Sequence, residues 1–244
     1  MNSSFPGFPP EALQFLRELK LNNRREWFQP RKDTYEEKVR GPMIELVAVL
    51  GEAIAEFAPE MVTEPKKAVY RLYRDVRFSS DKSPYKTHIA AVFSPRGMEK
   101  HSGAGMYFHI SVDEVLVGGG IYAPGPAELL AVRGHLASHA KELDKMLRER
   151  QFRTLFKEMT GEKLKRVPKG FPQDHPAANL LVYKQFLAGT LLPPDIVTTP
   201  KLFRELLKHF RTITPFLQFL NTPLKPSRAV VKARRPQSRK VRAR

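Results

Sequence analysis

The stretch that decides the fold is "GMYFHISVDEVLVGGGIY", residues 105–122. One side of its first half carries Met106, Phe108, Ile110 and Val112, and the other side carries Tyr107, His109 and Ser111. Such an alternation of apolar and polar residues is typical of a half-buried β-strand. We therefore expect strands at 105–112 and 114–122, joined as a tight antiparallel hairpin by a two-residue turn at Asp113-Glu114.

The same alternation extends to the segments on both sides of this hairpin. "VYRLYRDVRF" (69–78) and "THIAAVFS" (87–94) precede it, and "LVYKQFLAG" (181–189) follows later in the chain. Runs of this length, rich in β-branched and aromatic residues, predict strands. The expected sheet is a meander of about four antiparallel strands with one more strand from 181–189.

Apolar residues recur every three or four positions outside these segments, and this spacing predicts helices. The predicted helices cover about 10–21, 33–57, 126–150 and 199–217. Because we find no linker before residue 222, the simplest organisation is one domain at 1–222 followed by a tail at 223–244. The predicted fold class is α+β, with a mainly antiparallel sheet packed against N- and C-terminal helices.

Composition excludes several classes of protein. The chain has 244 residues, 41% of them hydrophobic, which is enough for a sizeable core. It has no cysteine, which excludes disulfides, a thiol nucleophile and cysteine-ligated zinc. Neither a signal peptide nor an apolar run of about 18 to 20 residues is visible, so we expect a cytoplasmic protein with no membrane partner.

The net charge of +17 is concentrated at one end of the chain. Residues 225–244 carry nine Lys and Arg and no acidic residue, which leaves +8 for the rest. Such a segment predicts a disordered basic tail. It would favour polyanions by releasing their counterions. The alternative is that the tail only aids solubility.

Known catalytic and cofactor motifs are missing from the sequence. It contains no GxxxxGK[ST] phosphate loop, no GxGxxG dinucleotide fingerprint and no GxSxG elbow. His135 and His139 have the i, i+4 spacing of metal ligands, but Leu136 stands where a metalloprotease needs glutamate. We therefore expect no metal and no cofactor.

The candidate functional stretch is "RDVRFSSDKSPYK", residues 74–86. On a strand over 69–78, alternation would place Arg71, Tyr73, Asp75 and Arg77 on one face. Asp75 could then orient the two neighbouring arginines, and paired guanidiniums suit a phosphate or carboxylate. The alternative is a purely structural turn, in which Asp81 caps backbone amides and the other charges form cross-strand ion pairs.

Three segments carry a resemblance to a known family: "NNRREWFQPRKDTYEE" (22–37), "YRDVRFSSDKSPYKTHIA" (73–90) and "GMYFHISVDEVLVGGGIYAP" (105–124). Together they resemble the family called domain of unknown function 2461, over about residues 6–222. The resemblance implies one α+β domain of bacterial cytoplasmic type and no established activity. The residues that match the family pattern are Asn23, Arg24, Trp27, Arg74, Asp75, Arg77, Asp81, Lys82, Tyr85 and Lys86.

Three functions remain open. The first is an anion-binding module for a phosphorylated small molecule or a nucleic acid. Its anion contacts would be Arg74, Asp75, Arg77, Asp81, Lys82, Tyr85 and Lys86, with Asn23, Arg24 and Trp27 as a wall. The second is an enzyme acting on a phosphorylated or carboxylated substrate with Asp75, Asp81 and Lys82 in its site. The third is a structural or partner-binding protein with no ligand. The sequence does not decide whether a reaction is catalysed or how many subunits assemble.

Overall fold

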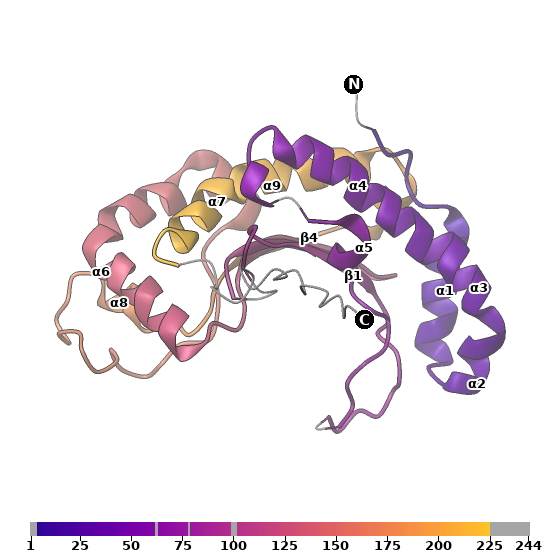
Figure 1. Ribbon diagram of the computed structural model, residues 1–244, viewed down its shortest axis with the longest axis horizontal. Helices are drawn as coiled ribbons and strands as arrows, with labels where there is room; N and C mark the ends of the chain where they lie inside the picture. The colour runs from indigo at the N-terminus through magenta and orange to yellow at the C-terminus, as the bar shows by residue number, and fades with distance from the viewer. Residues whose placement is uncertain (1–3, 62, 78, 99–101, 225–244) are drawn as a thin grey trace, which may run out of the picture.

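A four-stranded antiparallel sheet is the centre of the computed structural model, which describes residues 4–61, 63–77, 79–98 and 102–224 (Figure 1). The strands are β1 (Ile89–Phe93), β2 (Gly105–Ile110), β3 (Val115–Ile121) and β4 (Phe186–Leu192). They are neighbours in chain order, β1-β2-β3-β4. With helices around this sheet, the predicted α+β class is confirmed.

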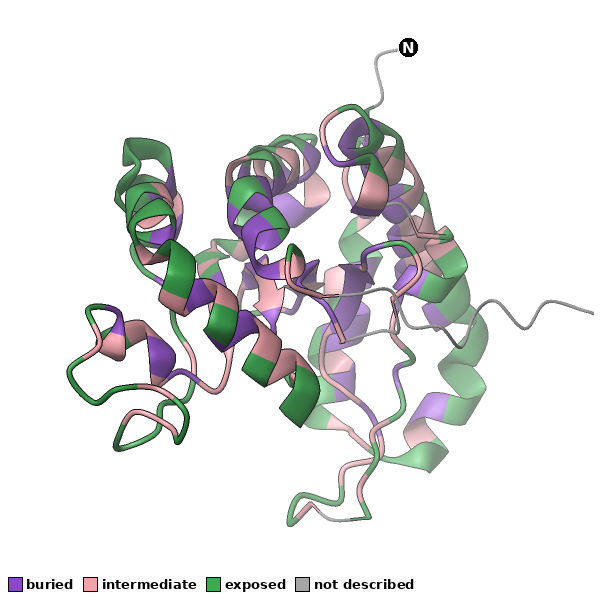
Figure 2. Ribbon diagram, turned by 60° about the vertical axis from the view of Figure 1, so that its left-hand side comes forward, coloured by how far each residue is buried: buried purple, intermediate pink, exposed green. Residues whose placement is uncertain are grey.

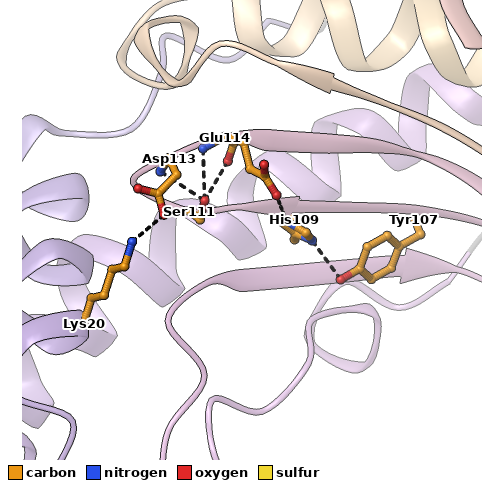
Figure 3. Close-up of polar contacts among 6 residues, drawn as sticks. All are labelled: Lys20, Tyr107, His109, Ser111, Asp113 and Glu114. Carbon is orange, nitrogen blue, oxygen red and sulfur yellow. Dashed lines mark hydrogen bonds and ion pairs between the residues drawn. The ribbon is translucent and has the colours of Figure 1, made fainter.

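The hairpin between β2 and β3 forms as predicted, but its turn lies one residue earlier. Ile110 is opposite Val115, and the Ser111 amide donates to the Glu114 carbonyl at 2.9 Å. The two turn residues are therefore Val112 and Asp113, and the predicted turn at Asp113-Glu114 is wrong. The Ser111 hydroxyl explains the shift, because its oxygen accepts from the amides of Asp113 (3.2 Å) and Glu114 (3.1 Å) and closes the turn (Figure 3).

Helices precede the sheet, follow β3 and end the described chain. Before the sheet come α1 (Pro10–Leu21), α2 (Arg25–Phe28), η1 (Gln29–Arg31), α3 (Lys32–Thr34), the π-helical η2 (Tyr35–Arg40), α4 (Gly41–Ala55), η3 (Pro59–Met61) and α5 (Pro65–Ala68). After β3 come α6 (Pro126–Arg148), α7 (Arg150–Phe156) and α8 (Ala178–Leu181). After β4 come η4 (Pro194–Thr198) and α9 (Lys201–Asn221). The strand predicted at 181–189 forms only from Phe186 onward, as β4, and Leu181 belongs to α8.

One face of the sheet is covered by α4 and α9, which lie side by side across it (Figure 1). The apolar side of β2 points into this layer, where Phe108 lies 6.2 Å from Phe210 of α9 between ring centroids. Phe93 of β1 lies 5.9 Å from the same ring. The helices turn their buried sides inward and their exposed sides outward (Figure 2). The core therefore lies between this helical layer and one face of the sheet.

Residues 69–77 do not form the predicted strand. Only isolated bridges occur there, between Val69 and Ala91 and between Tyr73 and Tyr85. The backbone instead runs as an irregular ribbon, in which the Arg74 amide donates to Pro84 at 2.9 Å and the Lys86 amide to Leu72 at 2.8 Å. The prediction fails because the charged side chains of this segment bond to one another and to nearby backbone groups in place of a regular ladder.

Most of the predicted basic tail is outside the residues that the structure describes. Residues 225–244, the core of the predicted basic tail, are outside the described residues, so their expected disorder stays a prediction. Among the helices of the described ranges, none is long and apolar enough to cross a membrane.

Candidate functional site

The face of the sheet opposite α4 and α9 lines a cavity of about 590 Å³, which we call the sheet cavity. Its polar walls are Tyr70, Lys86, His88, Tyr107, His109 and Tyr122. Its floor is made by glycines: Gly118 lies between Tyr107 and Gly189 in the register, and Gly105 lies opposite Gly120. Residues directly opposite each other share a face. The volume exists because neighbouring positions on that face carry no side chain.

Strand pairing explains two of these glycines. A Cβ built on Gly118 would collide with the carbonyl oxygen of Ala188, and one on Gly120 with that of Phe186. Gly120 also has φ +133°, which other residues rarely adopt. At Gly189 a Cβ would meet the Val117 oxygen only at 3.5 Å, an ordinary contact. The packing of the strands would therefore allow a side chain at position 189.

A chain of polar contacts runs along one wall of the sheet cavity (Figure 3). The Tyr107 hydroxyl lies 3.2 Å from Nδ1 of His109, and Nε2 of His109 lies 3.5 Å from Oε1 of Glu114. Burial lowers the pKa of His109, and Glu114 acts in the opposite direction. Burial raises the pKa of Tyr107 to about 12, so its hydroxyl stays protonated at neutral pH.

His88 and Tyr70 complete the aromatic part of this wall. The His88 ring stacks on His109 with centroids 4.7 Å apart, and burial, His109 and Lys86 lower the pKa of His88 to about 4. Tyr70 meets Tyr107 edge to face at 6.2 Å, and burial raises its pKa to about 12. At neutral pH these side chains are uncharged, and they offer hydrogen bonds and flat apolar surface.

Lys86 brings a cationic side chain to this cavity. Its ammonium lies 5.0 Å from the centroid of the Tyr70 ring. Burial and the nearby Arg71 lower the pKa of Lys86. Within the described ranges, no carboxylate lies within 4.0 Å of its nitrogen. A half-buried ammonium with an aromatic ring as its neighbour favours an added anion.

A second cavity, of about 540 Å³, adjoins the first and shares Lys86 and His88 with it. We call it the loop cavity. Its other lining residues are Lys20, Asn23, Arg74, Asp75, Asp81, Ser83, Tyr85 and Thr87. The structure thus brings six of the predicted site residues to one hollow: Asn23, Arg74, Asp75, Asp81, Tyr85 and Lys86. As far as the described residues define this hollow, Arg24, Trp27, Arg77 and Lys82 do not line it.

The charges of the predicted cluster largely satisfy one another. Arg77 binds Asp75 through Nε at 3.0 Å and Nη2 at 2.7 Å, which lowers the pKa of Asp75 to about 2. Arg74 pairs with Asp81, whose pKa is lowered mainly by that bond. The Lys82 ammonium donates to the Val76 carbonyl at 3.0 Å. Donors engaged in this way have less capacity left for a ligand.

Asn23, which lies between α1 and α2, forms a clip with the backbone of Tyr85. Asn23 donates through Nδ2 to the Tyr85 carbonyl at 2.9 Å and accepts from the Tyr85 amide at 3.1 Å. The Tyr85 ring is fully buried and lies 4.3 Å from Phe28 between centroids. Its hydroxyl has no hydrogen-bond partner in the described part of the chain. This arrangement is that of a core side chain.

The predicted wall residues Arg24 and Trp27 are not among the described residues that line either cavity. Trp27 packs against Phe15 at 5.5 Å and lies beneath the Arg31 guanidinium at 4.7 Å. Arg24 is exposed just before α2. Packing therefore accounts for Trp27, whereas the Arg24 side chain makes no hydrogen bond that caps α2 within the described part of the chain.

Sequence reasoning missed Tyr70, Tyr107, His109 and the glycines as site residues. The alternation in 105–112 had put Tyr107 and His109 on the polar face, which was the available signal. The alternation could not show that β3 pairs with β4, and it is this pairing that aligns Gly118 with Gly189.

Metal binding has little geometric support in the structure. The rings of His135 and His139 lie 4.2 Å apart, and the described residues contain no group of three or more His, Cys, Asp or Glu placed to hold a metal ion. The expectation that the protein binds no metal stays a prediction.

Comparison with known proteins gives a family and no activity. No curated protein and no solved structure shows significant similarity to this chain. The model of one family, described as conserved hypothetical protein (DUF2461), matches residues 11–219. This match includes the sheet, the ribbon and both cavities. The chain therefore belongs to the DUF2461 family of conserved hypothetical proteins.

Proposed function

We propose that this protein binds a small molecule that carries a phosphate or carboxylate, with Lys86 as the anion contact. The observation that supports it is the position of the Lys86 ammonium, half-buried between two cavities and without a carboxylate partner among the described residues. A cation that has lost part of its hydration is stabilised by an anion that takes the place of the lost water.

The size and lining of the sheet cavity favour a small ligand. Small-molecule sites are hollows of about 300–1,000 Å³, mostly apolar, with a few converging polar groups. The sheet cavity, at about 590 Å³, has this size and this character. The loop cavity adds Arg74 and Lys20 beside Lys86, but Arg74 is paired with Asp81 and Lys20 with Asp113 at 2.7 Å, so Lys86 is the cation that we assign to the anion.

Nucleic acid is the second candidate, and it depends on composition. Residues 225–244 carry nine positive charges, and a basic segment of this kind favours polyanions without sequence preference. The arrangement of the described residues supports the small ligand more strongly, because a single ammonium at a hollow of limited size suits one anionic group.

The test is calorimetric titration of the full chain with phenyl phosphate and with benzoate. We expect measurable binding by the wild type and a loss of about tenfold or more in Lys86→Met, because a hydrogen bond to a charged group contributes about 1.5–3 kcal/mol. Lys82→Met is the matched control, since its ammonium binds the Val76 carbonyl, and it should bind like the wild type. Failure of the wild type to bind either anion, or unchanged affinity in Lys86→Met, would refute the proposal.

A further inference from the structure

Tyr107 is placed to accept a hydrogen bond from whatever fills the sheet cavity. Oε1 of Glu114 lies 3.5 Å from Nε2 of His109, and a carboxylate can only accept, so this contact favours the tautomer with the proton on Nε2. In a neutral imidazole the other nitrogen, Nδ1, is then an acceptor. The Tyr107 hydroxyl, 3.2 Å from Nδ1, therefore donates a hydrogen bond to this nitrogen. Its oxygen lone pairs remain for a donor from the cavity.

The cavity also offers a surface for an aromatic ring. Three tyrosines line it: Tyr70, Tyr107 and Tyr122. Tyr70 and Tyr107 already meet edge to face, with an interplanar angle of 63°. Aromatic rings prefer such offset or edge contacts with a further ring. The bare backbone of the glycine floor lets a flat group lie close to the sheet.

The cation and the acceptor face the cavity from neighbouring positions. Tyr70 connects them, because its ring centroid lies 5.0 Å from the Lys86 ammonium and 6.2 Å from the Tyr107 ring centroid. Both groups line the same cavity and contact the same ring, so a ligand that binds both has to extend along Tyr70.

We infer that the ligand of the sheet cavity is an aromatic acid or aryl phosphate with an N–H or O–H donor on its ring. This inference rests on the proposed function. Lys86 binds the anionic group, and Tyr107 Oη accepts from the donor. The ring lies against the tyrosines and over the glycine floor. His109 and Glu114 are positioning residues, because they act on the ligand only through the hydroxyl of Tyr107.

The experiment compares benzoate with the three aminobenzoate isomers, by calorimetric titration of the full chain at neutral pH. In the wild type at least one isomer should bind about 3- to 10-fold more tightly than benzoate, the contribution of one neutral hydrogen bond. In Tyr107→Phe this gain should vanish while the affinity for benzoate stays within twofold. Tyr73→Phe, which removes the hydroxyl of an exposed tyrosine outside both cavities, should keep the gain.

A second measurement does not depend on ligand affinity. Nitrogen-15 NMR of the free protein should show His109 as the neutral tautomer with its proton on Nε2. A third variant tests the position of the ring: Gly189→Leu projects a side chain over the floor at a position where a Cβ is accommodated, and should abolish binding of benzoate.

These results separate the inference from the proposed function. If benzoate and phenyl phosphate both fail to bind the wild type, the proposed function itself is refuted. If they bind but no amino isomer gains affinity, or the gain survives in Tyr107→Phe, or His109 carries its proton on Nδ1, the inference is overturned and the anion site stands. Full benzoate binding in Gly189→Leu would likewise show that the ring lies elsewhere.

Discussion

Replacing Tyr85 with phenylalanine should stabilise this protein. The Tyr85 side chain is fully buried, and its hydroxyl has no hydrogen-bond partner in the described part of the chain. Burying a hydroxyl without a partner costs about 1–3 kcal/mol by mutational data on proteins. Phenylalanine keeps the ring that packs against Phe28 at 4.3 Å and Tyr73 at 5.3 Å between centroids.

The expected gain in the free energy of unfolding is about 1 kcal/mol, the lower end of that range, because removing the oxygen leaves a small gap in the packing. For a chain of this size, a change of 1 kcal/mol moves the melting temperature by about 2–4 °C. Thermal unfolding followed by far-ultraviolet circular dichroism, together with urea titration, measures both quantities.

A companion variant checks that the assay is sensitive at this place. Asn23→Ala removes both hydrogen bonds that Asn23 makes to the Tyr85 backbone, and should lower the free energy of unfolding by about 1–3 kcal/mol. If Tyr85→Phe instead destabilises the protein by 1 kcal/mol or more, the hydroxyl has a partner and the reasoning is refuted.

Two further predictions concern the sheet cavity. Because the pKa of His88 is about 4 in the folded protein and about 6.5 unfolded, the unfolded state alone takes up this proton as the pH falls from 6.5 to 4. Stability should therefore fall over that interval, and urea titrations should show a smaller fall in His88→Gln; an equal fall would contradict the low pKa. Gly118→Ala should destabilise strongly because its Cβ collides with the Ala188 carbonyl, whereas Gly189→Ala, directly across the ladder, should have a melting temperature near that of the wild type. Equal melting temperatures for the two variants would contradict the register.

The local contacts in the candidate stretch were partly visible in the sequence. The pairing of Asp75 with Arg77 and the capping of the Ser83 amide by Asp81 at 2.9 Å join residues two positions apart. Interactions over such short distances follow from the order of residues alone. The same contacts support the structural alternative for this stretch, since they use up donors that a ligand would need. Whether the stretch binds a ligand stays a prediction.

The irregular ribbon at 69–77 was beyond prediction from local pattern. Its alternation matches that of a true strand, but regular pairing requires a partner with free backbone groups in register. Here Lys82 binds the Val76 carbonyl, and Asn23, between α1 and α2, binds the backbone of Tyr85, which pairs with Tyr73. The residues that make these contacts lie outside 69–77, so the alternation within this segment cannot reveal them. The one-residue shift of the turn to Val112-Asp113 has a similar cause in the side chain of Ser111.

By itself, the sequence determined the β2–β3 hairpin, the class of the fold and the places of the main helices. These follow from hydrophobic period, which is a property of neighbouring residues. Only the tertiary structure decided where the two cavities lie. The glycine floor needs Gly118 to lie beside Gly189. The tautomer of His109 depends on Glu114 across the hairpin. The electrostatic environment of Lys86 depends on which charged groups lie near it in space, and these come from distant parts of the chain.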